Sequence, residues 1–90
     1  MSRPSDEAHS VPRFLIHHRH QPGECGIAFV AFRGHDSVLR QHPALAGCAY
    51  GEHAIWWAVD AADEEQALAL LPFFVAERST VTRVAAVVIP

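Results

Sequence analysis

The stretch "HAIWWAVDAADEEQ", residues 53–66, places a strand directly before a helix. In its first half, a strand would have apolar residues on both of its faces. This pattern predicts a central strand of a sheet. In its second half, Asp63 and Gln66 have the spacing of a capping box, and Ala67, Leu68 and Leu71 follow at helical spacing. The stretch therefore predicts a buried strand that leads into a helix.

On the N-terminal side, the pattern predicts a strand, a helix and a second strand. Phe14 and Ile16 share one face of a strand over 13–20 with His18 and His20, and Leu15, His17 and Arg19 take the other face. Apolar residues over 25–32 recur at helical spacing, and Gly34 fits the left-handed residue that follows a last helical turn. The segment "LAGCAY", residues 45–50, predicts another strand, in which Cys48 is expected to fill the core.

On the C-terminal side, Pro72 ends the helix, residues 72–79 are expected to form a short turn, and the β-branched run over 81–89 predicts a closing strand. The order β-α-β-β-α-β with short connections is typical of an α+β, ferredoxin-like plait. Such a plait has a four-stranded antiparallel sheet in the spatial order 4-1-3-2. We expect residues 13–90 to form this domain and residues 1–12, which lack an apolar period, to form a flexible N-terminal extension.

The composition limits the partners of the chain. Hydrophobic residues make up 50% of 90 residues, and both predicted helices cover one face of the sheet, which leaves Trp56 or Trp57 on the other. A second copy that buries this open face is expected, so we predict a homodimer. The formal net charge of the chain is −3, and its seven basic residues are arginines dispersed along the sequence. Both features argue against nucleic-acid binding.

The cysteine count, the length of the apolar runs and the residue usage indicate the cellular compartment of the protein. Two cysteines are too few for a secreted disulfide framework, and no apolar run reaches the roughly 20 residues that a membrane span requires. The chain has many Ala, Arg and Val residues and no Lys or Asn, which is typical of a high-GC bacterial coding bias. We therefore expect a bacterial, cytoplasmic protein with no membrane partner.

The stretch "DAADEEQALALLPFFVAERSTVTRVAAVVI", residues 60–89, together with the element order, resembles the small dimeric α/β-barrel superfamily. This superfamily includes muconolactone isomerase-like proteins, YCII-like proteins and a small nickel-binding family. The resemblance covers nearly all of residues 13–90 and implies that two copies form a dimeric α/β barrel. It concerns pattern, so it implies fold far more than activity.

Histidines gather where the first strand ends, in "FLIHHRHQPGECG", residues 14–26. His18 and His20 are two residues apart on a strand, so both rings lie on one face with a backbone separation of roughly 6.6 Å. The order 4-1-3-2 places His53, at the start of the third strand, beside them, and the first helix brings Cys25 to the same end. We predict that His18, His20, His53 and Cys25 bind a divalent transition metal such as Ni, Zn or Cu.

Other functions fit the same residues. A metal-free enzyme of the isomerase or YCII-like type would use His18 as an acid or base, and the resemblance to YCII-like proteins implies a catalytic pair that His35 and Asp36 match. Its substrate would be a small, planar, apolar molecule in a pocket lined by Trp56, Trp57, Phe14 and Ile16. A passive dimerisation module, in which the histidines are only structural, needs no site at all.

Overall fold

Four antiparallel strands form the sheet in the computed structural model, which describes residues 11–90. The strands are β1 (Arg13–Arg19), β2 (Leu45–Ala46), β3 (Ala54–Asp60) and β4 (Ser79–Val84), and they lie in the order β2-β3-β1-β4. This is the predicted order 4-1-3-2, read from the other edge. Ile16 of β1 pairs with Trp57 of β3 and with Val81 of β4, so these three residues share one face of the sheet.

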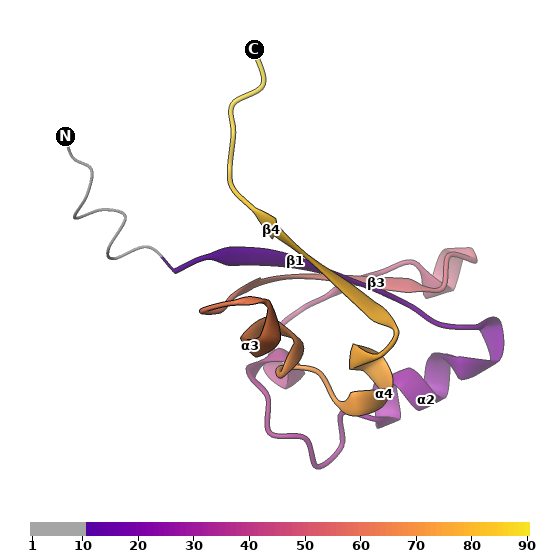
Figure 1. Ribbon diagram of the computed structural model, residues 1–90. Helices are drawn as coiled ribbons and strands as arrows, with labels where there is room; N and C mark the ends of the chain where they lie inside the picture. Colours follow the sequence, from indigo (N-terminus) through magenta and orange to yellow (C-terminus); the bar gives the residue numbers. More distant parts are fainter. Residues whose placement is uncertain (1–10) are drawn as a thin grey trace.

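Three short helices lie against that face (Figure 1). They are α2 (Cys25–Val30), α3 (Glu64–Leu68) and α4 (Phe73–Ala76), and 3₁₀ segments occupy Pro22–Glu24, Val38–Gln41 and Cys48–Tyr50. The predicted cap of α3 is present, because Asp63 Oδ1 accepts a hydrogen bond from the backbone N–H of Gln66 at 2.8 Å. Within residues 11–90, no helix has the length and apolar character that a membrane crossing demands.

The core lies between the sheet and the helices. Its largest fully buried side chains are Ile16, Ile55, Val75 and, unusually for a polar residue, His18. Burial of these apolar side chains is the main stabilising term for such a domain. The other buried apolar residues around them are Phe14, Leu39, Trp57, Val59, Ala67 and Leu71.

The opposite face of the sheet is not covered by any helix of the described residues (Figure 1). As expected, one of the two tryptophans lies there: the ring of Trp56 stacks on His17 with a centroid separation of 5.2 Å and an angle of 11°. Leu15 is 39% exposed and Leu45 is 75% exposed on the same face. The expected homodimer, and with it the barrel, stays a prediction.

Three sequence-based element boundaries are wrong. The segment 45–50 is a strand only over Leu45–Ala46, because the chain then turns at Gly47 into the 3₁₀ segment Cys48–Tyr50. Within the expected turn over 72–79, residues Phe73–Ala76 form the one-turn helix α4. The predicted strand over 81–89 begins earlier and ends at Val84, because Val84 pairs with Arg13, the first residue of β1. Residues 1–10 of the expected extension lie outside the described residues.

Adjacent substitutions on β1 test the assignment of its two faces. Ile16→Ala removes a side chain with no exposed surface, and we expect it to lower the free energy of unfolding by about 2–5 kcal/mol. Leu15→Ala changes the neighbouring residue on the open face, and we expect it to cost about 1 kcal/mol or less. Urea denaturation measures both, and equal losses would contradict the assignment.

Candidate metal centre

Four side chains with metal-ligating atoms converge at one end of the sheet. They are His20, Cys25, Cys48 and His53, and one ligand atom from each lies within 4.8 Å of all the others. His20 follows β1, Cys25 begins α2, Cys48 begins a 3₁₀ segment and His53 precedes β3. This is the end at which the chain leaves β1 and returns toward β3, on the right in Figure 1.

The closest contacts within this group each join one nitrogen and one sulfur. Cys25 Sγ lies 3.3 Å from Nε2 of His20 and 3.2 Å from Nδ1 of His53. Cys48 Sγ lies 3.4 Å from the same Nε2 of His20. In a tetrahedral zinc site with Zn–S of about 2.3 Å and Zn–N of about 2.0–2.1 Å, the S···N edges are about 3.5 Å. The donor atoms are therefore spaced nearly as four-coordinate binding requires.

Strand pairing brings the two histidines together. β1 and β3 are antiparallel, with Arg19 opposite Ala54, so the end of β1 lies beside the start of β3. The backbone N–H of His20 donates to the carbonyl oxygen of His53 at 3.0 Å, which extends the ladder by one step. The proximity of His20 and His53 thus follows from the sheet register.

Two tight turns bring the cysteines to the histidines. Residues 20–25 read "HQPGEC" and residues 48–53 read "CAYGEH". Each turn therefore holds a His and a Cys five residues apart, in mirrored order, with Gly-Glu before the second ligand. In the first turn, the backbone N–H of Gln21 donates to Glu24 Oε1 at 2.9 Å. In the second, Gly51 adopts a left-handed φ of 89°, a conformation that favours glycine.

The second turn also depends on Gly47. The backbone N–H groups of Tyr50 and Glu52 both donate to the carbonyl oxygen of Gly47, at 2.9 and 3.0 Å. A Cβ at position 47 would lie 2.7 Å from the carbonyl oxygen of Glu52. Only glycine therefore allows the backbone to close this turn and to place Cys48 next to His53.

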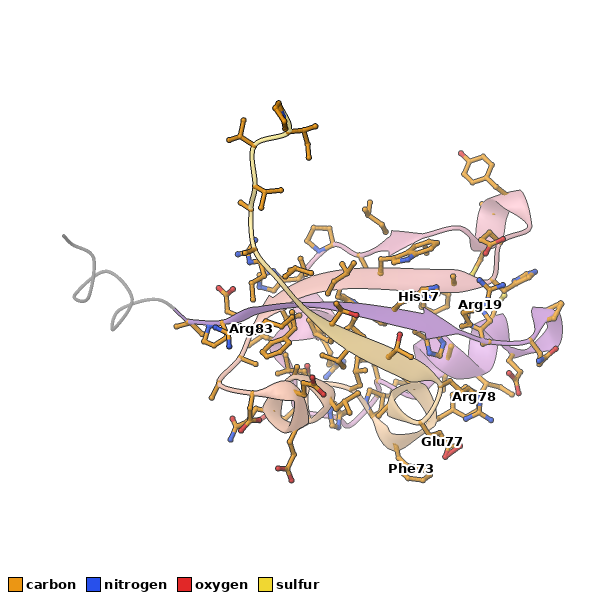
Figure 2. The ribbon with its side chains drawn as sticks, turned by 45° about the horizontal axis from the view of Figure 1, so that its top comes forward. His17, Arg19, Phe73, Glu77, Arg78 and Arg83 are labelled. Carbon is orange, nitrogen blue, oxygen red and sulfur yellow. The ribbon has the colours of Figure 1, made fainter. Side chains whose placement is uncertain are left out.

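Charged residues surround the group on the outside. Arg19 Nη1 donates to Glu52 Oε2 at 2.7 Å, and this contact holds the pKa of the Glu52 carboxyl below its usual value. Arg78 lies 3.8 Å from Glu24 and 2.8 Å from Glu77. Figure 2 shows Arg19 and Arg78 toward the end of the sheet opposite Arg83. The exposed Arg19–Glu52 pair connects the second turn to β1, and the half-buried Arg78–Glu24 pair connects the first turn to the segment after α4.

Ionisation of the group matches its donor chemistry. Burial lowers the pKa of His20, and the neighbouring His53 lowers it further, so the neutral, ligating form of the ring is favoured. Burial also raises the pKa of the Cys48 thiol, and the nearby Cys25 adds to this effect. The Cys48 thiolate therefore forms more readily beside a cation, and a divalent metal ion would supply that charge.

Of the four predicted ligands, His20, Cys25 and His53 belong to this group and His18 does not. His18 is fully buried next to it, with Nε2 at 3.0 Å from His20 Nδ1 and Nδ1 at 3.2 Å from the carbonyl oxygen of Val75. The expectation that Cys48 fills the core of a strand is wrong, because Cys48 lies in the half-exposed second turn. The mirrored spacing of "HQPGEC" and "CAYGEH" is the sequence signal that reveals it.

The residues predicted for an enzyme site are dispersed. Of the expected pocket residues, Trp57 lines an open cavity of about 410 Å³ between α2, the 39–46 segment and β3, whereas Phe14 and Ile16 are core residues and Trp56 lies on the open face. Asp36 is exposed. His35 is half-buried, and its Nε2 has no hydrogen-bond partner among the described residues.

Comparison of the chain with protein-family models, curated proteins and solved structures finds no match.

Two glycine substitutions test how the second turn is built. Gly47→Ala forces a Cβ against the backbone oxygen of Glu52, so we expect a loss of about 1–3 kcal/mol in unfolding free energy. Gly26→Ala is the matched control: it lies within α2, a Cβ there meets no atom within 4 Å, and we expect a gain of about 0.4–1 kcal/mol. Thermal unfolding of both variants gives the signs, and a neutral Gly47→Ala would contradict the assigned role of this turn.

Proposed function

We propose that this chain is a small transition-metal-binding protein whose centre consists of His20, Cys25, Cys48 and His53. The observation that carries the proposal is that two thiols and two imidazoles, all from this chain, place their donor atoms within 4.8 Å of one another. Such a set occurs in tetrahedral Cys₂His₂ zinc sites. The four ligands come from segments distant in sequence, so the cluster depends on the fold as a whole.

The donor set favours zinc over the other metals expected from the sequence. Two thiolates and two imidazoles in a tetrahedral arrangement suit Zn²⁺, whereas Ni²⁺ and Cu²⁺ favour square-planar or tetragonal sets of nitrogen and oxygen. Hard cations such as Mg²⁺ and Ca²⁺ require oxygen ligands, and the group offers none. Zinc is therefore the metal that we expect the centre to hold.

The proposed role of the ion is structural. Four protein ligands complete a tetrahedron and leave no position for a substrate, which is the arrangement of structural rather than catalytic zinc sites. The ion would connect the end of β1, the start of α2, the second turn and the start of β3. The isomerase-like enzyme, the passive dimerisation module and the resemblance to the dimeric α/β-barrel superfamily stay predictions.

Metal uptake by single variants tests the ligand set. We expect the wild type to bind one Zn²⁺ per chain and to form, with Co²⁺, a complex that shows tetrahedral ligand-field and thiolate charge-transfer absorption. Cys48→Ser removes a proposed ligand. It should weaken zinc binding by more than about 100-fold, which is the largest loss typical of removing a residue that only hydrogen-bonds to a ligand. A chelator competition measures the affinity.

His42→Ala is the matched control for this measurement, because His42 is exposed and outside the group. It should leave stoichiometry and affinity unchanged. A wild-type protein that takes up no zinc, or a Cys48→Ser variant that binds as tightly as the wild type, would overturn the proposal.

The structural role predicts that zinc stabilises the fold. Free Zn²⁺ at about 100 times its dissociation constant should raise the free energy of unfolding by about 2.7 kcal/mol, because the ion binds only the folded arrangement. A chelator should reverse this gain. Denaturant titrations with and without Zn²⁺ measure it, and a Cys25→Ser/Cys48→Ser double variant should show no dependence on zinc.

A further inference from the structure

His18 is the one fully buried titratable side chain next to the centre, yet it is not among the four clustered ligands. Its two ring nitrogens face different partners. Nδ1 lies 3.2 Å from the carbonyl oxygen of Val75 in α4, and Nε2 lies 3.0 Å from Nδ1 of His20. These two contacts determine which nitrogen of each ring carries its proton.

The assignment starts at Val75, because a carbonyl oxygen can only accept hydrogen bonds. This oxygen already accepts from the Ser79 hydroxyl at 2.7 Å and from the backbone N–H of Arg78 at 3.1 Å. Because the Ser79 hydroxyl directs its proton at Val75, its oxygen, which lies 3.4 Å from Nδ1 of His18, also presents only a lone pair to the ring. The ring of His18 must therefore present N–H, and not a lone pair, at Nδ1. A neutral imidazole carries one proton, so Nε2 of His18 bears the lone pair.

The same reasoning extends to His20. A lone pair on Nε2 of His18 at 3.0 Å from Nδ1 of His20 requires that Nδ1 be the donor, since two facing lone pairs would repel each other. The remaining nitrogen of His20, Nε2, then bears a lone pair. It is this nitrogen that lies 3.3 Å from Cys25 Sγ and 3.4 Å from Cys48 Sγ.

We propose that His18 is a positioning residue of the metal centre: it accepts the Nδ1 proton of His20 and so keeps Nε2 of that ring available to the ion. The relay is anchored on the carbonyl oxygen of Val75, 57 residues away in sequence. Partners of this kind orient a metal-bound histidine and increase its basicity. This inference rests on the proposed function and names a residue that acts through His20 without touching the ion.

Two substitutions at position 18 separate this role from packing. His18→Phe keeps a ring in the buried space but removes the acceptor, and we expect it to weaken Zn²⁺ binding 10–100-fold and to change the ligand-field absorption of the Co²⁺ complex. His18→Gln retains an amide oxygen that can accept from His20, and it should restore most of the affinity. His17→Phe is the matched control, because this neighbouring histidine faces the open side of the sheet and stacks on Trp56.

The outcomes decide the proposal. Unchanged zinc affinity in His18→Phe, or an equal loss in His17→Phe, would overturn it. Equal weakening by His18→Gln and His18→Phe would also overturn it, because packing alone would then explain the effect. Chelator competition with Zn²⁺ provides the affinities.

A measurement on the wild type needs no variant to fold. Imidazole ¹⁵N shifts should show both His18 and His20 protonated at Nδ1, and protonation of His18 at Nε2 would exclude the relay. If the wild type binds no zinc, the proposed function fails. The same ¹⁵N measurement on the metal-free protein then tests the relay independently.

Discussion

The antiparallel pairing of β1 with β3 is the constraint on which the site depends. Its register places Ile16 opposite Trp57 in the core and Arg19 opposite Ala54 at the end of the ladder. A shift of one residue would move every side chain of β1 to the other face of the sheet, because side chains alternate along a strand. Burial of the apolar face therefore fixes the register, and the register fixes the position of His20 beside His53. Core packing and donor-group geometry thus have the same cause.

The buried face of β1 changes from apolar to polar along its length, and this change explains the location of the centre. Phe14 and Ile16 pack in the core, whereas His18 occupies the next inward position with no exposed surface. A buried imidazole must satisfy both ring nitrogens, and His18 does so through Val75 and His20. The polar end of the strand is therefore a hydrogen-bonded continuation of the core, and it ends in the His and Cys group.

Much of this arrangement follows from sequence patterns. Strand alternation predicts β1 and β3, the Asp63 cap predicts α3, and Gly34 has the expected positive φ of 77°. The pattern fails where tertiary contacts decide the outcome. β4 ends at Val84 because β1 offers no further partner, although the β-branched run continues. The strand-like composition of "LAGCAY" predicts a strand through Cys48, whereas the backbone turn at Gly47 is determined by a close approach to Glu52.

The helices explain why this domain would benefit from a bound ion. α2, α3 and α4 span six, five and four residues, far below the roughly 12–15 at which an isolated helix becomes even marginally stable in water. They persist only because the sheet and core hold them in place. The residues at the start of α2 are half-buried or exposed, so burial of apolar side chains holds this end of the helix only weakly. An ion bound through Cys25 would attach this helix start to β1, β3 and the second turn, at the end of the domain where the hydrophobic core is replaced by polar side chains.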